Sequence, residues 1–575
     1  MTLFKTLLIP ACLAVLLSGC ATTQAPSKTD APGAESVAGA APLPAADLEP
    51  ETLYTLLVAE LAGQRKRYDI LLSNYLSAAR ETRDPGLAER ATRIAASIKA
   101  RKATFMAAQL WHEVAPDNPE AKQVLAAQLL LNGQVHEAVG LMEELLQETG
   151  EASFDHLAAS SRQLTPIQRD DLLIELERLL GKYPDNTQLL TAKIVLLQLN
   201  GRNEEALLSA NELDRQQNSV RSLSIKAKLN HQLGNTEQAL KDLKKGLKKH
   251  PDDQVLRVLY AQMLIDDKQL RAAQTQFEQL VKQSPENDQL RLTLALLQLE
   301  NSAFRKGNDN LKMLLKNPAL KDEVQFYLGQ SAEKAGQPET AIDHYRLVSA
   351  GSKFLPAYHR LGTLSLEQGN LARLQTLFAQ ARQSHVEHSK SLYIIEAELL
   401  AEKNLVDNAL QLLNQALEQH PDDINLLYTR AMTSEKINDL AAMEMDLRAI
   451  LSQEPDNAMV LNALGYTLAD RTTRYEEALA LISRANELKP NDPAITDSLG
   501  WAQFRMGNYE EAIRLLERAH ADFPDHEVAA HLGEALWTNG QQQRARQIWQ
   551  EALERQPDSP ILKRVIERLS PDLNQ

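Results

Sequence analysis

Apolar residues recur along the chain at intervals of three or four, which is the spacing of one face of an α-helix. The clearest double stripe consists of Leu461, Leu464, Leu468, Ala478, Ile482 and Ala485. A short polar turn divides this stripe, so the pattern predicts two antiparallel amphipathic helices. Gly465 and Ala478 lack bulky side chains, and the two helices are therefore expected to approach most closely there.

Prolines followed by an acidic or amide residue punctuate this pattern. They are Pro116, Pro184, Pro251, Pro285, Pro421, Pro455, Pro490, Pro524 and Pro557. Apart from the longer gap between Pro285 and Pro421, the intervals are 68, 67, 34, 34, 35, 34 and 33 residues. Each is one or two multiples of about 34, a period typical of stacked helix pairs. The Asp or Asn after the proline is suited to cap the next helix.

These stripes and this period resemble the tetratricopeptide repeat family over nearly all of residues 51–560. The resemblance implies an all-α, right-handed superhelical α-solenoid of about fifteen helix pairs with a C-terminal capping helix. The expected organisation is N-terminal repeats at 51–152, a degenerate helical unit at 153–186, the main array at 187–560, and a capping helix with tail at 561–575. Residues 300–320 are also irregular.

The amino-terminal segment predicts export and a lipid anchor. Lys5 precedes a short apolar run that ends in Leu17-Ser18-Gly19-Cys20. This ending resembles the lipobox of bacterial lipoproteins, which implies a signal peptide at 1–19 and acylation of Cys20. The alternative is an ordinary secretory signal with an accidental cysteine. By the same resemblance, Ala21 directly after the cysteine favours the outer membrane, with the body facing the periplasm.

Residues 20–50 comprise the cysteine and a tether rich in Ala and Pro that has too little apolar surface to fold. The tether has an r.m.s. span of roughly 30 Å. With 62 basic and 77 acidic residues the net charge is −15, which disfavours nucleic acid as a partner. No phosphate-binding glycine loop, GxSxG or HExxH motif is present, so neither an enzyme nor a cofactor is predicted.

Two pairs of histidines and one basic run are the polar clusters that could carry chemistry. His385 and His388 have a spacing that suits two metal ligands, but the register places them in a turn between units and predicts a solvated turn without metal. His526 and His531 are given the same interpretation. The basic run 241–249 is predicted to be a solvated helix face, the alternative being a patch for an acidic partner or lipid phosphates.

The candidate binding residues follow from the repeat register. In tetratricopeptide arrays the first helix of each pair lines the concave surface, and aromatic anchors with polar neighbours suit a peptide groove. The partner-binding residues inferred from that register are Tyr428, Met432, Tyr466, Asp497, Trp501, Phe504, Arg505 and Trp537. The alternative is that Trp501 and Phe504 pack between adjacent units as core.

An array without a catalytic motif predicts a scaffold. The order of lipobox, tether and many repeats resembles the proteobacterial lipoproteins that partner a periplasmic carboxyl-terminal processing protease. That resemblance implies an adaptor that binds the protease and presents peptidoglycan hydrolases for degradation. The competing prediction is an assembly lipoprotein for an outer-membrane secretin or a polymer-export machine.

Overall fold

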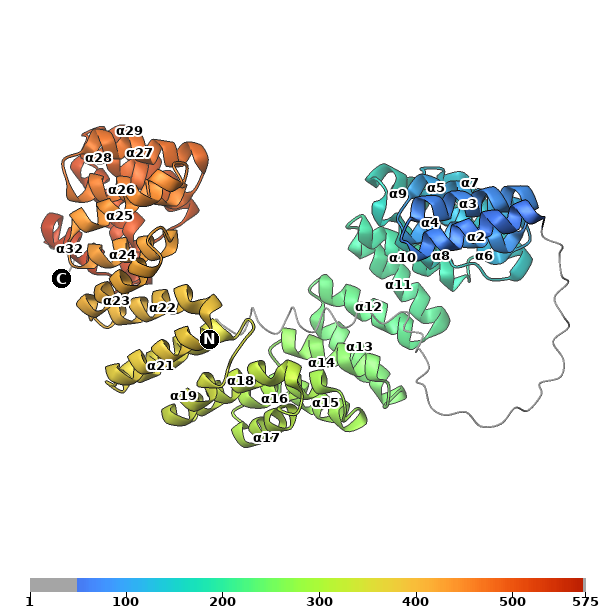
Figure 1. Cartoon of the computed structure of the whole chain (residues 1–575), viewed down its shortest axis with the longest axis horizontal. Helices are drawn as coiled ribbons and strands as arrows, with labels where there is room; N and C mark the ends of the chain where they lie inside the picture. Colours follow the sequence, from blue (N-terminus) through green and yellow to red (C-terminus); the bar gives the residue numbers. More distant parts are fainter. Residues whose placement is uncertain (1–48, 572–575) are drawn as a thin grey trace. The chain divides into compact units, whose positions relative to one another are not determined.

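The computed structural model describes residues 49–571, and within that range it contains helices and turns but no β-strand. The chain divides into two units inside α11 (Asn203–Gln217), unit 1 being Met1–Ser209 and unit 2 Ala210–Gln575. The signal peptide, Cys20 and most of the tether lie outside the described residues, as do residues 572–575. Figure 1 shows the helices in chain order.

The helices that begin in unit 1 are α2 (Pro50–Gln64), α3 (Tyr68–Thr82), α4 (Pro85–Ser97), α5 (Arg101–Val114), α6 (Pro119–Leu131), α7 (Val135–Thr149), α8 (Phe154–Ser160), α9 (Pro166–Lys182), α10 (Thr187–Leu199) and α11 (Asn203–Gln217). Unit 2 continues with α12 (Val220–Gln232), α13 (Thr236–Lys249), α14 (Gln254–Asp266), α15 (Leu270–Gln283), α16 (Asp288–Glu300), α17 (Phe304–Leu314), α18 (Lys321–Lys334), α19 (Pro338–Arg346), α20 (Phe354–Glu367), α21 (Leu371–Ser384), α22 (Ser389–Glu402) and α23 (Val406–Gln419). The last nine are α24 (Ile424–Lys436), α25 (Leu440–Gln453), α26 (Ala458–Arg471), α27 (Tyr475–Leu488), α28 (Pro493–Arg505), α29 (Tyr509–Asp522), α30 (His526–Thr538), α31 (Gln542–Arg555) and α32 (Pro560–Leu569).

The helix pairs form where the apolar stripes predict them. Gly465 on α26 faces α27, and a Cβ atom there would lie 2.5 Å from Ile482 Cγ1 and 3.0 Å from the carbonyl oxygen of Ala478. At Gly500 on α28 a Cβ atom would lie 2.7 Å from Leu516 Cγ on α29. Contacts this short would force the neighbouring atoms to move if either glycine were replaced by a residue with a Cβ atom. The predicted closest approach at Gly465 and Ala478 is confirmed.

Acidic and amide residues after the prolines begin the first helix of the pairs. The Asn457 carboxamide accepts from the Val460 N–H at 3.2 Å, and Asp492 and Asp525 cap α28 and α30 in the same way. Such a cap satisfies a backbone N–H that the helix itself leaves without an acceptor. The short polar segment around each proline therefore ends one helix and starts the next.

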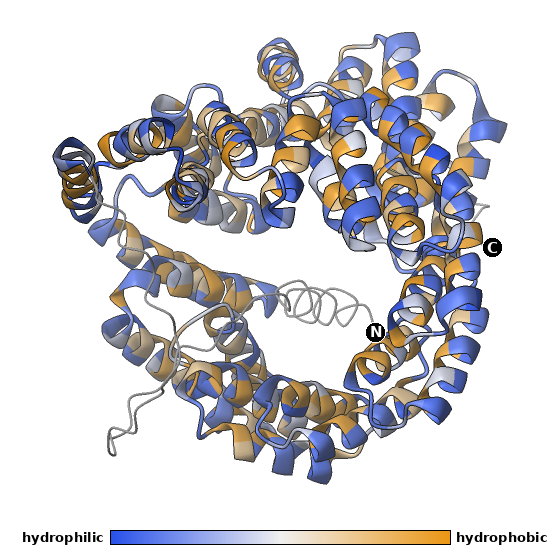
Figure 2. Cartoon of the chain, turned by 90° about the vertical axis from the view of Figure 1, so that its right-hand side faces the viewer, coloured by the Kyte–Doolittle hydropathy of each residue, from blue (hydrophilic) through white to orange (hydrophobic). Residues whose placement is uncertain are grey.

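The stripes meet in clusters of buried side chains inside each unit. In unit 2 one cluster of buried side chains runs from Leu292 to Ala502, and a second contains Trp549 of α31 with Leu562 and Ile566 of α32. Figure 2 shows hydrophobic and hydrophilic residues alternating around individual helices. α32 covers the last pair with its apolar side, as a capping helix does in a repeat array.

The irregular stretches have identifiable forms. Residues 153–186 contain the seven-residue α8, a single 3₁₀ turn and the longer α9. Residues 300–320 contain α17, of only 11 residues, and another 3₁₀ turn at Pro318–Leu320. Across residues 49–571, none of the helices has both the length and the apolar character needed to cross a membrane.

Candidate functional site

A cavity of about 470 Å³ opens on the inner helices of the last repeats of unit 2. Five helices contribute to it, namely α24, α26, α28, α30 and α32. The lining residues are Glu435, Tyr466, Thr467, Asp470, Arg471, Trp501, Phe504, Arg505, Glu527, His531, Glu534, Ile561, Arg564, Val565 and Arg568. Residues as far apart in the sequence as Glu435 and Arg568 therefore meet at one hollow.

Three stacked rings form one wall of this cavity. The Trp501 ring lies between those of Phe504 and His531, with centroid distances of 5.0 and 4.2 Å and interplanar angles of 23° and 22°. The indole N–H of Trp501 donates to Asp470 Oδ1 at 3.2 Å. Both faces and the polar edge of this indole are therefore fixed, which makes the wall rigid.

A buried polar chain holds the stack in place. His531 Nδ1 lies 3.0 and 3.1 Å from the two carboxylate oxygens of Asp497, and its Nε2 lies 3.3 Å from Tyr466 Oη. The Tyr466 hydroxyl in turn donates to Glu527 Oε1 at 2.8 Å. Since both nitrogens of His531 are engaged and the ring is only 4% exposed, this histidine positions its neighbours and does not exchange protons with a ligand.

The charges around His531 and Tyr466 set their protonation. Burial alone would lower the pKa of His531, but the Asp497 carboxylate outweighs it and raises the pKa above the ordinary histidine value. Burial, together with the Glu527 carboxylate, raises the pKa of the Tyr466 hydroxyl, so this group stays a hydrogen-bond donor. The Asp497 carboxylate therefore favours the imidazolium form of His531 in this wall.

This pairing predicts a pH dependence of stability. A histidine whose pKa is raised on folding stabilises the fold fully below its unfolded pKa of about 6.5, and that contribution is lost as the pH rises through the folded pKa. We expect the free energy of unfolding of the wild-type protein to decrease from pH 6 to pH 9. The decrease should be larger than that of the His531→Gln variant over the same range. Denaturant unfolding of both proteins at the two pH values measures the difference, because the other titrating groups are common to both. Equal pH dependence in the two proteins would contradict the charged pair.

Cations and carboxylates both reach the cavity, at different depths. Arg471 and Arg568 have side chains 44% and 57% exposed and lie towards the rim, whereas Glu534, which pairs with Arg568 at 2.5 Å, is 11% exposed. Arg505 donates to the Asp470 carbonyl oxygen at 2.8 Å and to Tyr475 Oη at 3.0 Å. Arg564 is exposed, and among residues 49–571 it has neither an ion pair nor a side-chain hydrogen bond. Such a lining suits a polypeptide segment that carries both apolar and charged groups.

The structure brings together five of the eight residues inferred from the register. Tyr466, Trp501, Phe504 and Arg505 line the cavity, and Asp497 lies behind it as the partner of His531. Trp501 is 5% exposed and belongs to the core cluster, so the two interpretations of this residue combine: it packs between units and its ring also forms the wall.

The other three lie elsewhere. Tyr428 and Met432 on α24 are half-buried against the core and do not line the cavity. Trp537 stacks on Trp549 at 5.7 Å and lies 5.6 Å from the Arg546 guanidinium, so its ring is directed into the last helix pair. The end of α30 points Trp537 towards α31, which the register alone does not reveal.

The interpretation of His531 as part of a solvated turn is wrong. His531 lies near the middle of α30 and is buried. His526 begins that helix and is half-buried, and its Nδ1 lies 3.1 Å from Ser559 Oγ. The signal that finds His531 is the period, because Asp497 precedes it by 34 residues, one repeat, and therefore occupies the equivalent inner position on α28.

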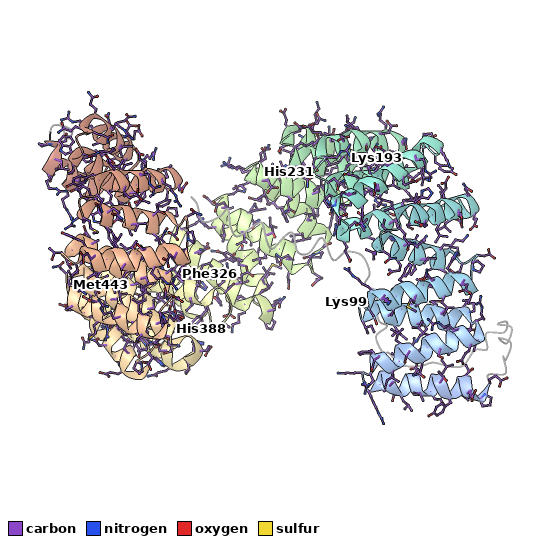
Figure 3. The ribbon with its side chains drawn as sticks, turned by 90° about the horizontal axis from the view of Figure 1, so that it is seen from above. Lys99, Lys193, His231, Phe326, His388 and Met443 are labelled. Carbon is purple, nitrogen blue, oxygen red and sulfur yellow. The ribbon has the colours of Figure 1, made fainter. Side chains whose placement is uncertain are left out.

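His385 and His388 lie in the turn between α21 and α22, where the register places them. Figure 3 labels His388. Their rings pack on Phe354, with centroid distances of 4.8 and 4.6 Å. The predicted position in a turn is confirmed, but both histidines are half-buried against an aromatic residue of the core and are not fully solvated. In the part of the chain that the structure describes, no group of three or more His, Cys, Asp or Glu residues is arranged to hold a metal ion.

Sequence comparison decides the family. Residues 231–297, 359–424 and 498–560 match family models described as tetratricopeptide repeat. The chain is also 48% identical over 484 residues to the TPR repeat-containing protein PA4667 of Pseudomonas aeruginosa, covering 84% of this chain and 82% of that protein. The chain belongs to the tetratricopeptide repeat family. The predicted all-α tetratricopeptide solenoid is therefore confirmed, and the protein is a scaffold that binds other proteins.

Two solved structures are similar at low sequence identity. A tetratricopeptide repeat protein from Parabacteroides merdae is 17% identical, with a TM-score of 0.33, covering 43% of this chain and 97% of that chain. Yeast Tom70 is 16% identical, with a TM-score of 0.30, covering 90% of this chain and 99% of that chain.

Proposed function

We propose that this tetratricopeptide repeat protein is a lipid-anchored adaptor of the periplasmic face of the outer membrane. It binds a carboxyl-terminal processing protease and presents peptidoglycan hydrolases to it for degradation. The observation that carries the proposal is the cavity of unit 2, a rigid aromatic wall with charged groups of both signs built by five inner helices. A hollow of that kind suits a polypeptide anchor.

A second exposed surface supports binding of two partners. In unit 1, α2 carries an apolar strip whose members are largely exposed, namely Leu53 (48%), Tyr54 (70%), Leu57 (54%) and Leu61 (54%). Contiguous exposed apolar residues on one helix mark an interaction surface. An adaptor needs one surface for the protease and another for the substrate, and each unit offers one.

The tether supports the simultaneous binding of the protease and its substrate. Acylation at Cys20 would confine the body to within roughly 30 Å of the membrane surface. Confinement raises the effective concentration of two bound partners, since the second contact becomes intramolecular. An adaptor that must bring two partners together benefits from this effect.

Affinity capture from detergent-solubilised envelope, followed by mass spectrometry, tests the adaptor role. With a catalytically inactive protease in the same cells, we expect both the protease and cell-wall hydrolases to be recovered, because bound substrates are no longer degraded. Hydrolase abundance should rise when the adaptor is removed. Recovery of a secretin or of polymer-export proteins without a protease would overturn the proposal.

The anchor is tested separately by metabolic labelling with a fatty acid. We expect the wild-type chain to carry the label and Cys20→Ser to lose it completely, because the thiol of Cys20 is the acylation site. Cys12→Ser is the matched control and should keep the label, since Cys12 lies inside the segment that is removed. Equal labelling of the Cys20→Ser chain would contradict the anchor.

A further inference from the structure

Three consecutive outer helices of unit 2 have a charge opposite to that of the whole protein. Helices α13, α15 and α17 carry ten basic and four acidic residues, a balance of +6, in a chain with a net charge of −15. The basic residues are Lys241, Lys244, Lys245, Lys248, Lys249, Arg271, Lys282, Arg305, Lys306 and Lys312. All ten are exposed, and we call them the basic face.

The helices of the basic face are adjacent members of one array. They are the second helices of three successive pairs, and Figure 1 shows α13, α15 and α17 along the outer edge of this stretch, with α14 and α16 inside them. On α13 the core side is fixed by Leu240 and Leu243, which are buried. Lys241, Lys245 and Lys248, spaced four and three apart, therefore share the opposite side of the helix.

The cations of the basic face are free of ion pairs. Within residues 49–571, none of the ten forms one, and only Lys249 makes a side-chain hydrogen bond, to Asn218 Oδ1 at 3.4 Å. Asp242, an acidic residue of the same helix, is 3.2 Å from Lys226 and is thus already paired. The positive charge of α13 is not neutralised by its own fold.

Outer helices elsewhere in the chain behave differently. Glu143 on α7 pairs with Arg178 at 3.1 Å and with Lys182 at 2.7 Å, both on α9. Glu444 on α25 pairs with Arg474, at the start of α27, at 2.7 Å. Charged side chains on these outer helices are thus neutralised by ion pairs with a neighbouring helix. The cations of α13, α15 and α17 are not.

We propose that the basic face binds the anionic phospholipid headgroups of the membrane to which the chain is anchored. This inference rests on the proposed lipid anchor, which holds the body within roughly one tether length of the headgroups. Each lysine or arginine at an anionic bilayer surface contributes about a fivefold gain in association. The contact would turn the outer helices of this stretch towards the membrane and leave their inner side to protein partners.

The composition of the face favours lipid over an acidic protein. Eight of the ten cations are lysines, and the one large exposed apolar side chain on the three helices is Met313. Protein interfaces are depleted in lysine and enriched in aromatic residues and arginine. Flexible lysines spread over three helices instead match a fluid surface of separate phosphates, on which no fixed geometry is required.

Vesicle flotation tests the proposal with the mature chain from residue 21, prepared without its acyl group. We expect the protein to float with phosphatidylglycerol-rich vesicles and not with phosphatidylcholine vesicles, and the binding to weaken as salt is raised. The triple variant Lys241→Gln, Lys245→Gln and Lys248→Gln should bind on the order of tenfold or more weakly. The matched control changes Lys403, Lys436 and Lys489 to Gln. These are three exposed lysines of unit 2 that lie later in the chain and do not belong to the basic face.

The outcomes separate the alternatives. Equal binding to both kinds of vesicle, or equal loss in the triple variant and the control, would overturn the proposal. Unchanged vesicle binding by the triple variant together with loss of an acidic protein in envelope capture would assign the face to a protein and also overturn it. Failure of flotation leaves the capture of protease and hydrolases unaffected, so the two proposals fail independently.

Discussion

Replacing Trp549 by alanine is expected to destabilise the last helix pair and its capping helix by about 3–5 kcal/mol, the usual cost of removing a fully buried large aromatic side chain. Trp549 on α31 has no exposed surface and lies at the centre of the cluster that contains Leu562 and Ile566 of α32. Across the pair its indole lies against Gly533 of α30, where a Cβ atom would collide with the ring. Alanine would therefore leave a cavity in place of the indole.

The effect should stay local. Each pair in a repeat array contacts chiefly its neighbours, so the earlier repeats keep their own stability. Amide hydrogen exchange measures this directly: the core amides of α30–α32 should exchange at least a hundredfold faster, while those of α24–α26 change little. Global loss of protection across unit 2 would contradict the local interpretation.

Trp549→Phe is the matched control. The indole N–H is buried without a hydrogen-bond acceptor among the described residues, so phenylalanine loses volume but removes that polar group. We expect this variant to cost much less than alanine. A cost equal to that of alanine would show that the indole N–H has a partner and that packing is not the main term.

The fold could be predicted because one period governs it. The 34-residue spacing of Pro455, Pro490 and Pro524 places the helix pairs, and the small residues Gly465 and Ala478 place their contact. Those features depend on sequence-local physics: a proline ends a helix, an Asp or Asn caps the next, and a glycine admits a close neighbour.

The site could be predicted only in part. The register identified Tyr466, Trp501, Phe504 and Arg505, which line the cavity, because inner positions repeat with the same period. It did not show that α32 closes the hollow, since that depends on how five helices converge. The register misses His531 because it places polar residues near a proline in the turn, whereas the turn ends at Asp525, which caps α30.

The cavity and the cap are physically coupled. Ile561, Arg564, Val565 and Arg568 of α32 form one side of the cavity, while Val565 and Ile566 also belong to the cluster around Trp549. Loosening α32 therefore removes a wall of the binding site without touching the ring stack. We expect Trp549→Ala to weaken partner capture as a consequence of lost structure, and a direct test of the site needs variants that leave the core intact.

Such variants are available on the solvent side of the cavity. Phe504 is half-buried at the end of the ring stack and at the edge of two core clusters, and Arg564 is exposed on α32. We expect Phe504→Ala combined with Arg564→Glu to weaken capture of the partner on the order of thirtyfold, since an aromatic anchor and an arginine are the residues that most often dominate binding energy. Quantitative pull-down against the partners identified by envelope capture measures the effect.

The control for this pair is Lys563→Glu. Lys563 is the neighbour of Arg564 on α32, is exposed and does not line the cavity. Its replacement by Glu changes the net charge by the same amount as Arg564→Glu. A side chain one position along a helix is turned by about 100°, so it faces away from the hollow. If Lys563→Glu weakens capture as much as the double variant does, the effect is one of net charge. If neither does so while hydrogen exchange of α28–α32 is unchanged, the partner binds elsewhere on the array and the cavity is not its site.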